Sequence, residues 1–173
     1  HNIQAMTSVI LRHLVEMTDK YRLSESDILM ISTASALHDI GKISIDEKIL
    51  NKPGKLTDEE YEIMKTHTTI GADMLKSLDI SDKSSIIGIA YDICRWHHER
   101  YDGKGYPDGL KGDEIPISAQ VVALADVYDA LTSKRCYKNA LPHIQAITMI
   151  KNGECGVFNP LLMQCLTDIE DQI

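Results

Sequence analysis

Two adjacent histidines, His97 and His98, open the segment HHERYDGKGYP at residues 97–107, in which an acidic residue follows them and a loop with two glycines and a proline comes next. Neutral imidazole nitrogens are common ligands of Fe, Mn, Zn, Ni and Co. A cluster of glycine and proline by itself indicates only a loop. The histidine pair therefore predicts a metal site only if other ligand-type side chains meet it in the fold.

Further histidines and aspartates occur at the ends or on the apolar faces of predicted helices. Asp126, for example, lies inside the apolar segment VVALADVYDAL at residues 121–131. A buried carboxylate either takes up a proton or lies beside a positive charge, and an uncompensated buried polar group is costly. A bound cation would compensate all of these residues at once, so we expect a metal site built from His38, Asp39, His67, His97, His98 and Asp126.

Each of these residues has a simpler explanation when it is taken alone. A His-Asp pair at a helix end, such as His38 and Asp39, can act as a cap or interact with the helix dipole. A single histidine on an apolar face, such as His67, can be a hydrogen-bonded core residue. Asp129, one turn after Asp126, fits equally well as an exposed acid or as a partner that orients a ligating imidazole. The joint occurrence on four separate predicted helices favours the metal site.

Helices must position these side chains, because apolar residues recur at helical spacing and no convincing strand pattern is present. A first helix is expected over residues 7–20. Ser24 with Asp27 predicts the start of a second helix, which would end near Gly41 and carry the His-Asp pair at its C-terminal end.

Thr57 and Glu60 predict a capping box for a third helix, which would carry His67 one turn after Met64. Later helices are expected from Ser85 to His97, from a cap at Ser118, over residues 143–151, and from Asn159 with Pro160 in its first turn. The predicted fold class is all-α, a bundle of about seven or eight helices in a single domain spanning residues 1–173.

Composition narrows the function classes. A chain of 173 residues with 43% hydrophobic residues is long enough to bury the core of one domain. Lys and Arg number 18 against 26 Asp and Glu, and this net charge of −8 argues against polynucleotide binding. The four cysteines have no C-x-x-C spacing, and we expect reduced thiols.

The apolar segments and the start of the sequence bear on where the domain is located and whether it belongs to a longer protein. Apolar runs of about 20 residues and a signal peptide are absent, so a cytoplasmic domain without membrane insertion is expected. The chain starts without an initiator Met, so we expect it to be part of a longer protein. A sensory or regulatory domain upstream is compatible with this, and the sequence does not identify it. A homodimer is compatible with the sequence.

Four segments in order give a resemblance to a known family. HDIGK (38–42), KTHTTIGA (65–72), HHERYDGKGYP (97–107) and ALADVYDALTSKRCY (123–137) resemble the HD-GYP domain, a branch of the HD phosphohydrolase superfamily. The resemblance runs from about residue 24 to the C-terminus and implies an HD-domain-like helical bundle. The His-Asp pair alone would be weak support, whereas the ordered set is specific.

The resemblance implies metal-dependent hydrolysis of the bacterial second messenger cyclic di-GMP to linear pGpG, with GMP as a further product. It implies two divalent metal ions, with Fe or Mn favoured, and Asp39 as the ligand between them. Asp39 and Lys42 are the residues that it implies for catalysis. The implied metal ligands are His38, Asp39, His67, His97, His98 and Asp126.

For the substrate, the resemblance implies phosphate contact by Lys42, a pocket mouth formed by Gly105, Tyr106 and Pro107, and a dinucleotide contact by Arg135. The sequence departs from the family at Cys136, where a proline is usual, and at Tyr101, where tryptophan is common. Some family members hold a third ion through a Glu and a His near the first helix. His1 is a candidate for that histidine, but no Glu precedes it.

Two alternatives stay open. The same metal site could act on another nucleotide, such as a nucleoside polyphosphate or a different cyclic dinucleotide. The domain could also bind a cyclic dinucleotide as a sensor without hydrolysing it. The GKGYP loop and Arg135 favour the cyclic di-GMP enzyme, and the complete set of ligand-type residues argues against a sensor.

Overall fold

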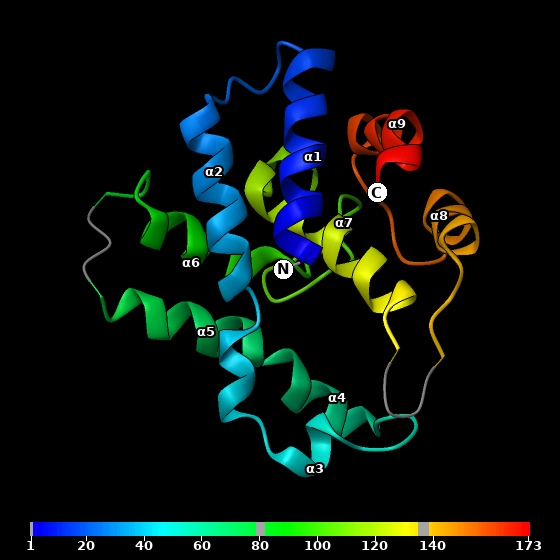
Figure 1. Ribbon diagram of the computed structural model, residues 1–173. Coiled ribbons are helices and arrows are strands. Elements are labelled where there is room, and N and C mark those ends of the chain that lie inside the picture. The colour runs from blue at the N-terminus through cyan, green and yellow to red at the C-terminus, as the bar shows by residue number, and fades with distance from the viewer. Residues whose placement is uncertain (1, 79–81, 135–138) are drawn as a thin grey trace.

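The computed structural model describes residues 2–78, 82–134 and 139–173. Within these ranges the protein is all-α, with no strand, as predicted (Figure 1). Glu47–Leu50 forms a single turn, and the other eight α-helices agree with the seven or eight expected. The helices are α1 Asn2–Met17, α2 Glu25–Ala34, α3 Glu47–Leu50, α4 Asp58–Lys65, α5 His67–Lys76, α6 Ile86–Trp96, α7 Ile117–Thr132, α8 His143–Lys151 and α9 Pro160–Ile169.

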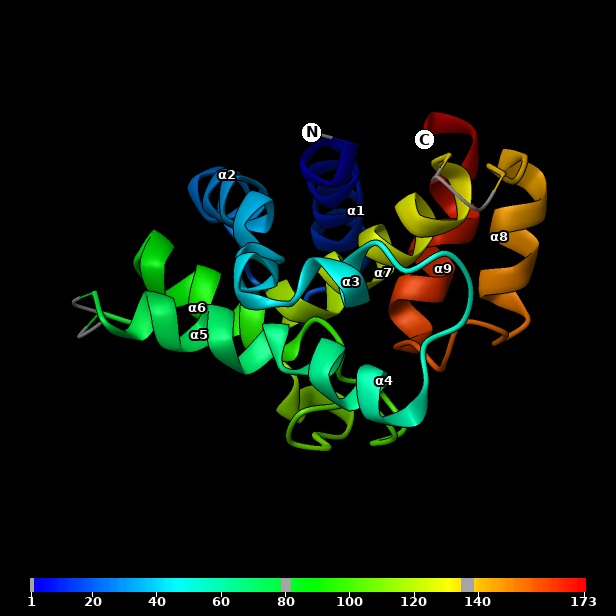
Figure 2. The same cartoon turned by 90° about the horizontal axis from the view of Figure 1, so that it is seen from below.

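The core forms around α1, which contacts α2, α7 and α9. Ile10, Leu11 and Leu14 lie at helical spacing on its buried face, where each fully buried aliphatic side chain contributes about 1.5–3 kcal/mol. The helices α2 and α6 lie on one side of α7 and α8 lies on the other, and both views agree on this order (Figures 1 and 2). Next to this core, α6 contacts both α5 and α7.

The helix starts follow the predicted capping pairs. Ser24 and Asp27 form a reciprocal capping box, as do Thr57 and Glu60. The Ser85 side chain accepts a hydrogen bond from the amide of Gly88 at the start of α6. Such caps contribute about 1 kcal/mol each. The starts of α2, α4 and α6 are therefore encoded locally.

The single helix predicted to carry both Met64 and His67 is wrong, because α4 ends at Lys65 and α5 begins at His67. Three successive side chains bond to carbonyl oxygens at this point. Thr66 Oγ1 donates to Ile63 O at 2.5 Å, His67 Nδ1 to Met64 O at 2.7 Å and Thr68 Oγ1 to Lys65 O at 2.8 Å. Side-chain bonds of this kind compete with the backbone bonds of a continuous helix.

Three other expected boundaries also differ. The first helix, expected over residues 7–20, spans Asn2–Met17. The helix α2 ends at Ala34, and two short 3₁₀ helices, Ser35–Leu37 and Ile40–Ser44, flank His38 and Asp39. Ser118 does not cap α7, because the helix already begins at Ile117 after Pro116, whose ring fixes an extended start. Ser118 is buried in the first turn instead. Among the described residues, no helix combines the length and the apolar character needed to cross a bilayer.

Candidate metal centre

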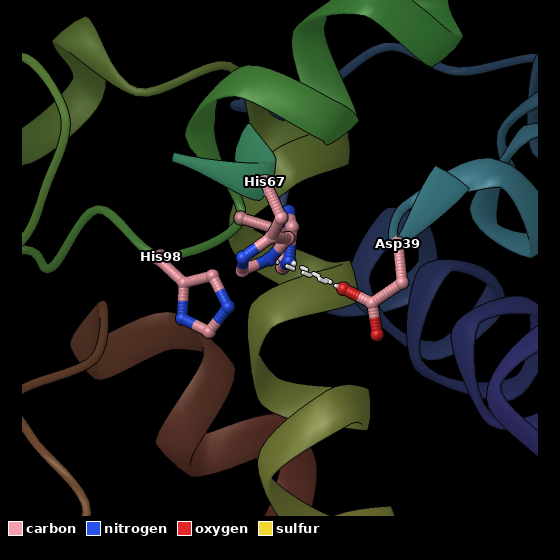
Figure 3. Close-up of side chains that lie close together, drawn as sticks. Asp39, His67 and His98 are labelled. Atoms are coloured by element: carbon pink, nitrogen blue, oxygen red, sulfur yellow. Dashed lines mark ion pairs between the residues drawn. The ribbon is translucent and has the colours of Figure 1, made fainter. Parts of the chain in front are cut away.

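Asp39 lies between two sets of side chains. Its Oδ1 is 3.2 Å from His67 Nε2 and 3.4 Å from His97 Nε2. Its Oδ2 is 3.1 Å from His38 Nε2 and 3.1 Å from Lys42 Nζ. Figure 3 shows Asp39 pointing toward His67, with His98 facing the same space from the other side. The two oxygens of the Asp39 carboxylate therefore lie next to different partners.

All six residues expected to bind metal lie together. Two groups have ligand atoms that all fall within 4.8 Å of one another, and Asp39 belongs to both. One group contains Asp39, His67, His97 and His98, and the other contains His38, Asp39 and Asp126. Such sets of imidazole nitrogens and carboxylate oxygens suit Fe, Mn, Zn, Co or Ni. The cluster can hold divalent metal.

Backbone carbonyls fix the orientation of three of the imidazoles. His38 Nδ1 bonds to Ser35 O at 2.7 Å, and His97 Nδ1 bonds to Ile93 O at 2.8 Å. His67 Nδ1 bonds to Met64 O, as described above. A carbonyl oxygen only accepts hydrogen bonds, so each Nδ1 carries the proton. When the ring is neutral, its Nε2 presents a lone pair toward the cluster, as in a ligating histidine.

The same atoms have no hydrogen-bond partner among the described residues. They are buried and comprise the Nε2 atoms of His38, His67 and His97 together with Oδ1 of Asp39. His67 is only 2% exposed and His97 only 1%. Buried polar atoms without partners are costly, and lone pairs facing a carboxylate at 3.2–3.4 Å repel it unless a cation or proton lies between them. The residues therefore fit a bound cation.

Burial and the close neighbours in the cluster also shift the pKa values of its residues. Burial lowers the pKa of His38, but the adjoining carboxylates of Asp126 and Asp39 raise it more, to about 10. Burial raises the pKa of Asp39, yet the adjoining imidazoles of His38, His67 and His97 outweigh it and lower the pKa below its usual value. Burial lowers the pKa of His98 well below 6.5, with further lowering from His97. A metal ion would have to displace a proton from His38.

Gly41 allows Asp39 to reach His67. A Cβ at Gly41 would overlap the carbonyl oxygen of His67 and lie 2.7 Å from the amide nitrogen of Gly71. Gly71 in turn lies against Gly41, where a Cβ would be 3.1 Å from the Gly41 nitrogen. These two glycines let the 3₁₀ helix Ile40–Ser44 contact the first turn of α5 backbone to backbone.

The loop after the histidine pair folds back over its own start. The buried carboxylate of Glu99 accepts hydrogen bonds from the amides of Asp108 at 2.7 Å and Leu110 at 2.8 Å. Glu99 therefore orients the loop. A Cβ at Gly105 would lie 2.5 Å from the backbone nitrogen of Arg100, so only glycine fits there.

A pocket of about 470 Å³ opens beside the histidines. Of the residues expected to contact substrate, Lys42, Gly105 and Tyr106 line it, whereas Pro107 is exposed and is not in its lining. Arg135 and His1 lie outside the described residues. Cations from Lys42, Arg100 and Lys104 line the pocket, which suits an anionic ligand.

Sequence reasoning missed part of the pocket wall and left the role of Asp129 open. Tyr61, Met64, Arg100 and Lys104 also line the pocket, and only the helical spacing of the first two just before His67 could have indicated a wall. Asp129 accepts a hydrogen bond from Ser133 Oγ at 3.0 Å. It does not orient an imidazole within the described structure, because backbone carbonyls hold the three buried rings.

Comparisons with known proteins agree with this geometry. The family model described as HD domain matches residues 2–157. The chain is 42% identical over 167 residues to a "Probable cyclic di-GMP phosphodiesterase" of Vibrio cholerae, covering 94% of this chain and 38% of that protein. It is 43% identical over 157 residues to a "Cyclic di-GMP phosphodiesterase" of Thermotoga maritima, covering 91% of this chain and 42% of that protein.

A solved structure supports the fold. An HDG"Y"P protein from Bdellovibrio bacteriovorus aligns with a TM-score of 0.67 at 20% identity, over 97% of this chain and 51% of that one. The chain spans about two fifths of the length of the two curated relatives above. The chain belongs to the HD domain family, and its resemblance to the HD-GYP branch is confirmed.

Proposed function

We propose that the chain is a metal-dependent phosphodiesterase that hydrolyses cyclic di-GMP to linear pGpG, with GMP as a further product. The observation that carries this proposal is the position of Asp39 between two ligand groups whose inward-facing nitrogens have no other partner among the described residues. The names of the Vibrio and Thermotoga relatives support the substrate. Residues 1–173 act in this proposal as one catalytic domain of a longer protein, in the cytoplasm.

In this proposal the six clustered residues would hold two divalent cations, Fe or Mn, and Asp39 would contribute to both. His67, His97 and His98 would bind one cation, and His38 with Asp126 would bind the other. When bound, such a pair supplies an activated water and neutralises charge on the phosphoryl group. The carbonyl bonds to the three Nδ1 atoms hold the rings in place, so the ligands need little reorganisation.

Lys42 orients the scissile phosphate. Its ammonium lies 3.1 Å from Asp39 Oδ2 and is accessible from the pocket. A positive charge placed beside a phosphoryl oxygen stabilises the charge that develops there during in-line displacement, commonly by about 3 kcal/mol. Gly105 and Tyr106 shape the pocket mouth, next to exposed Pro107. Arg135 holds the dinucleotide in this proposal on the basis of the family resemblance alone.

The test is elemental analysis of anaerobically prepared protein, paired with chromatography of the products formed from cyclic di-GMP. We expect about two equivalents of Fe or Mn per chain and the appearance of pGpG. Tight binding of cyclic di-GMP by metal-loaded protein without any product would instead identify a sensor. Protein that binds no divalent metal would overturn the proposal.

A second substrate deserves a parallel assay because another relative has a different name. The chain is 41% identical over 152 residues to "3'3'-cGAMP-specific phosphodiesterase 2" of Vibrio cholerae, covering 88% of this chain and 28% of that protein. Comparing kcat/KM for cyclic di-GMP and 3'3'-cGAMP on the same metal-loaded sample separates the two. A higher value for 3'3'-cGAMP would reassign the substrate and leave the metal centre unchanged.

A further inference from the structure

Tyr61 is an exposed aromatic residue on the wall of the pocket beside the histidines. It lies on α4 and is 47% exposed, yet it lines the same pocket as His67, His98 and Lys42. An isolated exposed tyrosine needs no explanation. Tyr61 differs because the pocket that it lines also contains several cationic side chains and two of the clustered histidines.

The neighbours of Tyr61 hold its ring in place. Tyr106 contacts it in a T-shaped arrangement, with ring centroids 6.4 Å apart. The ammonium of Lys65 lies 5.2 Å from the Tyr61 centroid and 5.4 Å from the Tyr106 centroid. Lys65 is itself paired with Glu62 at 2.7 Å. The cation–π contact with Tyr61 contributes about 0.5–1 kcal/mol at such a partly exposed position and, together with the contact with Tyr106, favours this orientation of the Tyr61 ring.

Tyr106 is less available for a new ring contact than Tyr61. His98 stacks against it with an interplanar angle of 11° and centroids 4.9 Å apart. Lys65 and Tyr61 cover further parts of the same half-buried ring. Among the aromatic residues described in this pocket, Tyr61 therefore offers the most open ring surface.

The pocket is lined by both charged and aromatic or apolar side chains. The histidines and Lys42 would take a phosphate, whereas Tyr61 and Met64 would meet an uncharged flat group. We propose that Tyr61 is the platform on which a guanine base of the cyclic dinucleotide stacks, and that it sets substrate affinity. This inference rests on the proposed function and adds the residue that recognises the base rather than the phosphate.

Stacking predicts a specific kinetic signature. A base on an aromatic side chain contributes about 1–3 kcal/mol, as judged by alanine substitution. The base does not change during hydrolysis, so the contact stabilises substrate and transition state alike. Its removal should raise KM and leave kcat unchanged. The binding loss corresponds to a KM increase of roughly fivefold to a hundredfold.

The experiment compares Tyr61→Ala with Tyr61→Phe, and uses Ile63→Ala as the matched control. Ile63 lies on the same helix and is 46% exposed, but it is not in the pocket lining. We expect Tyr61→Ala to raise KM for cyclic di-GMP at least about fivefold with kcat within about twofold. Tyr61→Phe and Ile63→Ala should behave like the unaltered protein.

Each outcome has a separate meaning. If Tyr61→Ala leaves KM unchanged while the unaltered protein hydrolyses cyclic di-GMP, the stacking inference is wrong and the proposed function stands. If Tyr61→Phe is as impaired as Tyr61→Ala, the hydroxyl and not the ring is responsible, and stacking is again excluded. If the unaltered protein forms no product but binds cyclic di-GMP, direct binding measurements on the same variants test the platform, with the same loss expected for Tyr61→Ala.

Discussion

Gly41 lies so close to the carbonyl of His67 that no Cβ fits between them, and this contact brings Asp39 within 3.2 Å of His67 Nε2. The two residues belong to different elements, the 3₁₀ helix Ile40–Ser44 and α5. The glycine therefore acts through backbone proximity and has no chemistry of its own.

Gly41→Ala should lower both stability and metal content. The obstructing atoms are backbone atoms of His67 and Gly71, which cannot rotate away. Overpacking of this kind costs about 1–3 kcal/mol or more. Thermal unfolding and elemental analysis measure the two effects, and Ser44→Ala, at an exposed position of the same 3₁₀ helix, is the control. A variant with unchanged melting temperature and full metal content would contradict this role.

Lys42→Ala should retain metal and lose rate. Its ammonium is expected to stabilise the phosphoryl group and not to bind metal, so kcat should fall about a hundredfold, equivalent to about 3 kcal/mol. The measurement is kcat for cyclic di-GMP alongside metal content. Lys48→Ala, at an exposed lysine on α3, is the control and should be unchanged. Loss of metal together with rate in Lys42→Ala would remove Lys42 from phosphate binding.

Glu99→Gln should loosen the loop that shapes the pocket mouth. The substitution replaces one of two accepting oxygens with a donor that faces the amide of Asp108 or Leu110. A buried donor left without a partner costs about 1–3 kcal/mol. We expect a lower melting temperature and a faster exchange of these two amide hydrogens. Unchanged amide exchange would show that the carboxylate does not hold the loop.

Asp92→Asn should stabilise the protein at neutral and alkaline pH. Burial raises the pKa of Asp92 to about 6, and Lys83 offsets only part of this. The pKa of Asp92 in the folded protein lies above the unfolded value of 3.8, so ionisation of this carboxyl destabilises the fold. The stability associated with the protonated group is fully present below pH 4 and is lost as pH rises through 6. Since Asp92 is partly exposed, the expected gain at pH 8 is on the order of 1–2 kcal/mol.

Denaturant unfolding of the Asp92→Asn variant and the unaltered protein at pH 8 and pH 4 checks this prediction. The difference in the free energy of unfolding should be present at pH 8 and should vanish near pH 4. A difference that is the same at both pH values would show that the charge of Asp92 is not its cause.

The all-α fold and the gathering of the six ligand-type side chains could be predicted because their signals are local. Capping pairs such as Ser24 with Asp27 give helix starts, and an acid such as Asp126 within an apolar segment indicates an unusual environment. The break at Thr66 could not be predicted, because the bonds from three successive side chains to carbonyl oxygens of the preceding turn form only in the folded geometry. The same limit applies to Tyr61, whose place in the pocket wall depends on the packing of α4 against the loop containing Tyr106.

The most direct test of the central claim is electron paramagnetic resonance of the protein titrated with Mn(II) in the absence of substrate. If Asp39 joins two neighbouring metal positions, the second equivalent should produce the spectrum of an exchange-coupled manganese pair, and Asp39→Asn should abolish that coupling. A spectrum of isolated manganese ions at every loading, or coupling that persists in Asp39→Asn, would contradict the shared role of this carboxylate.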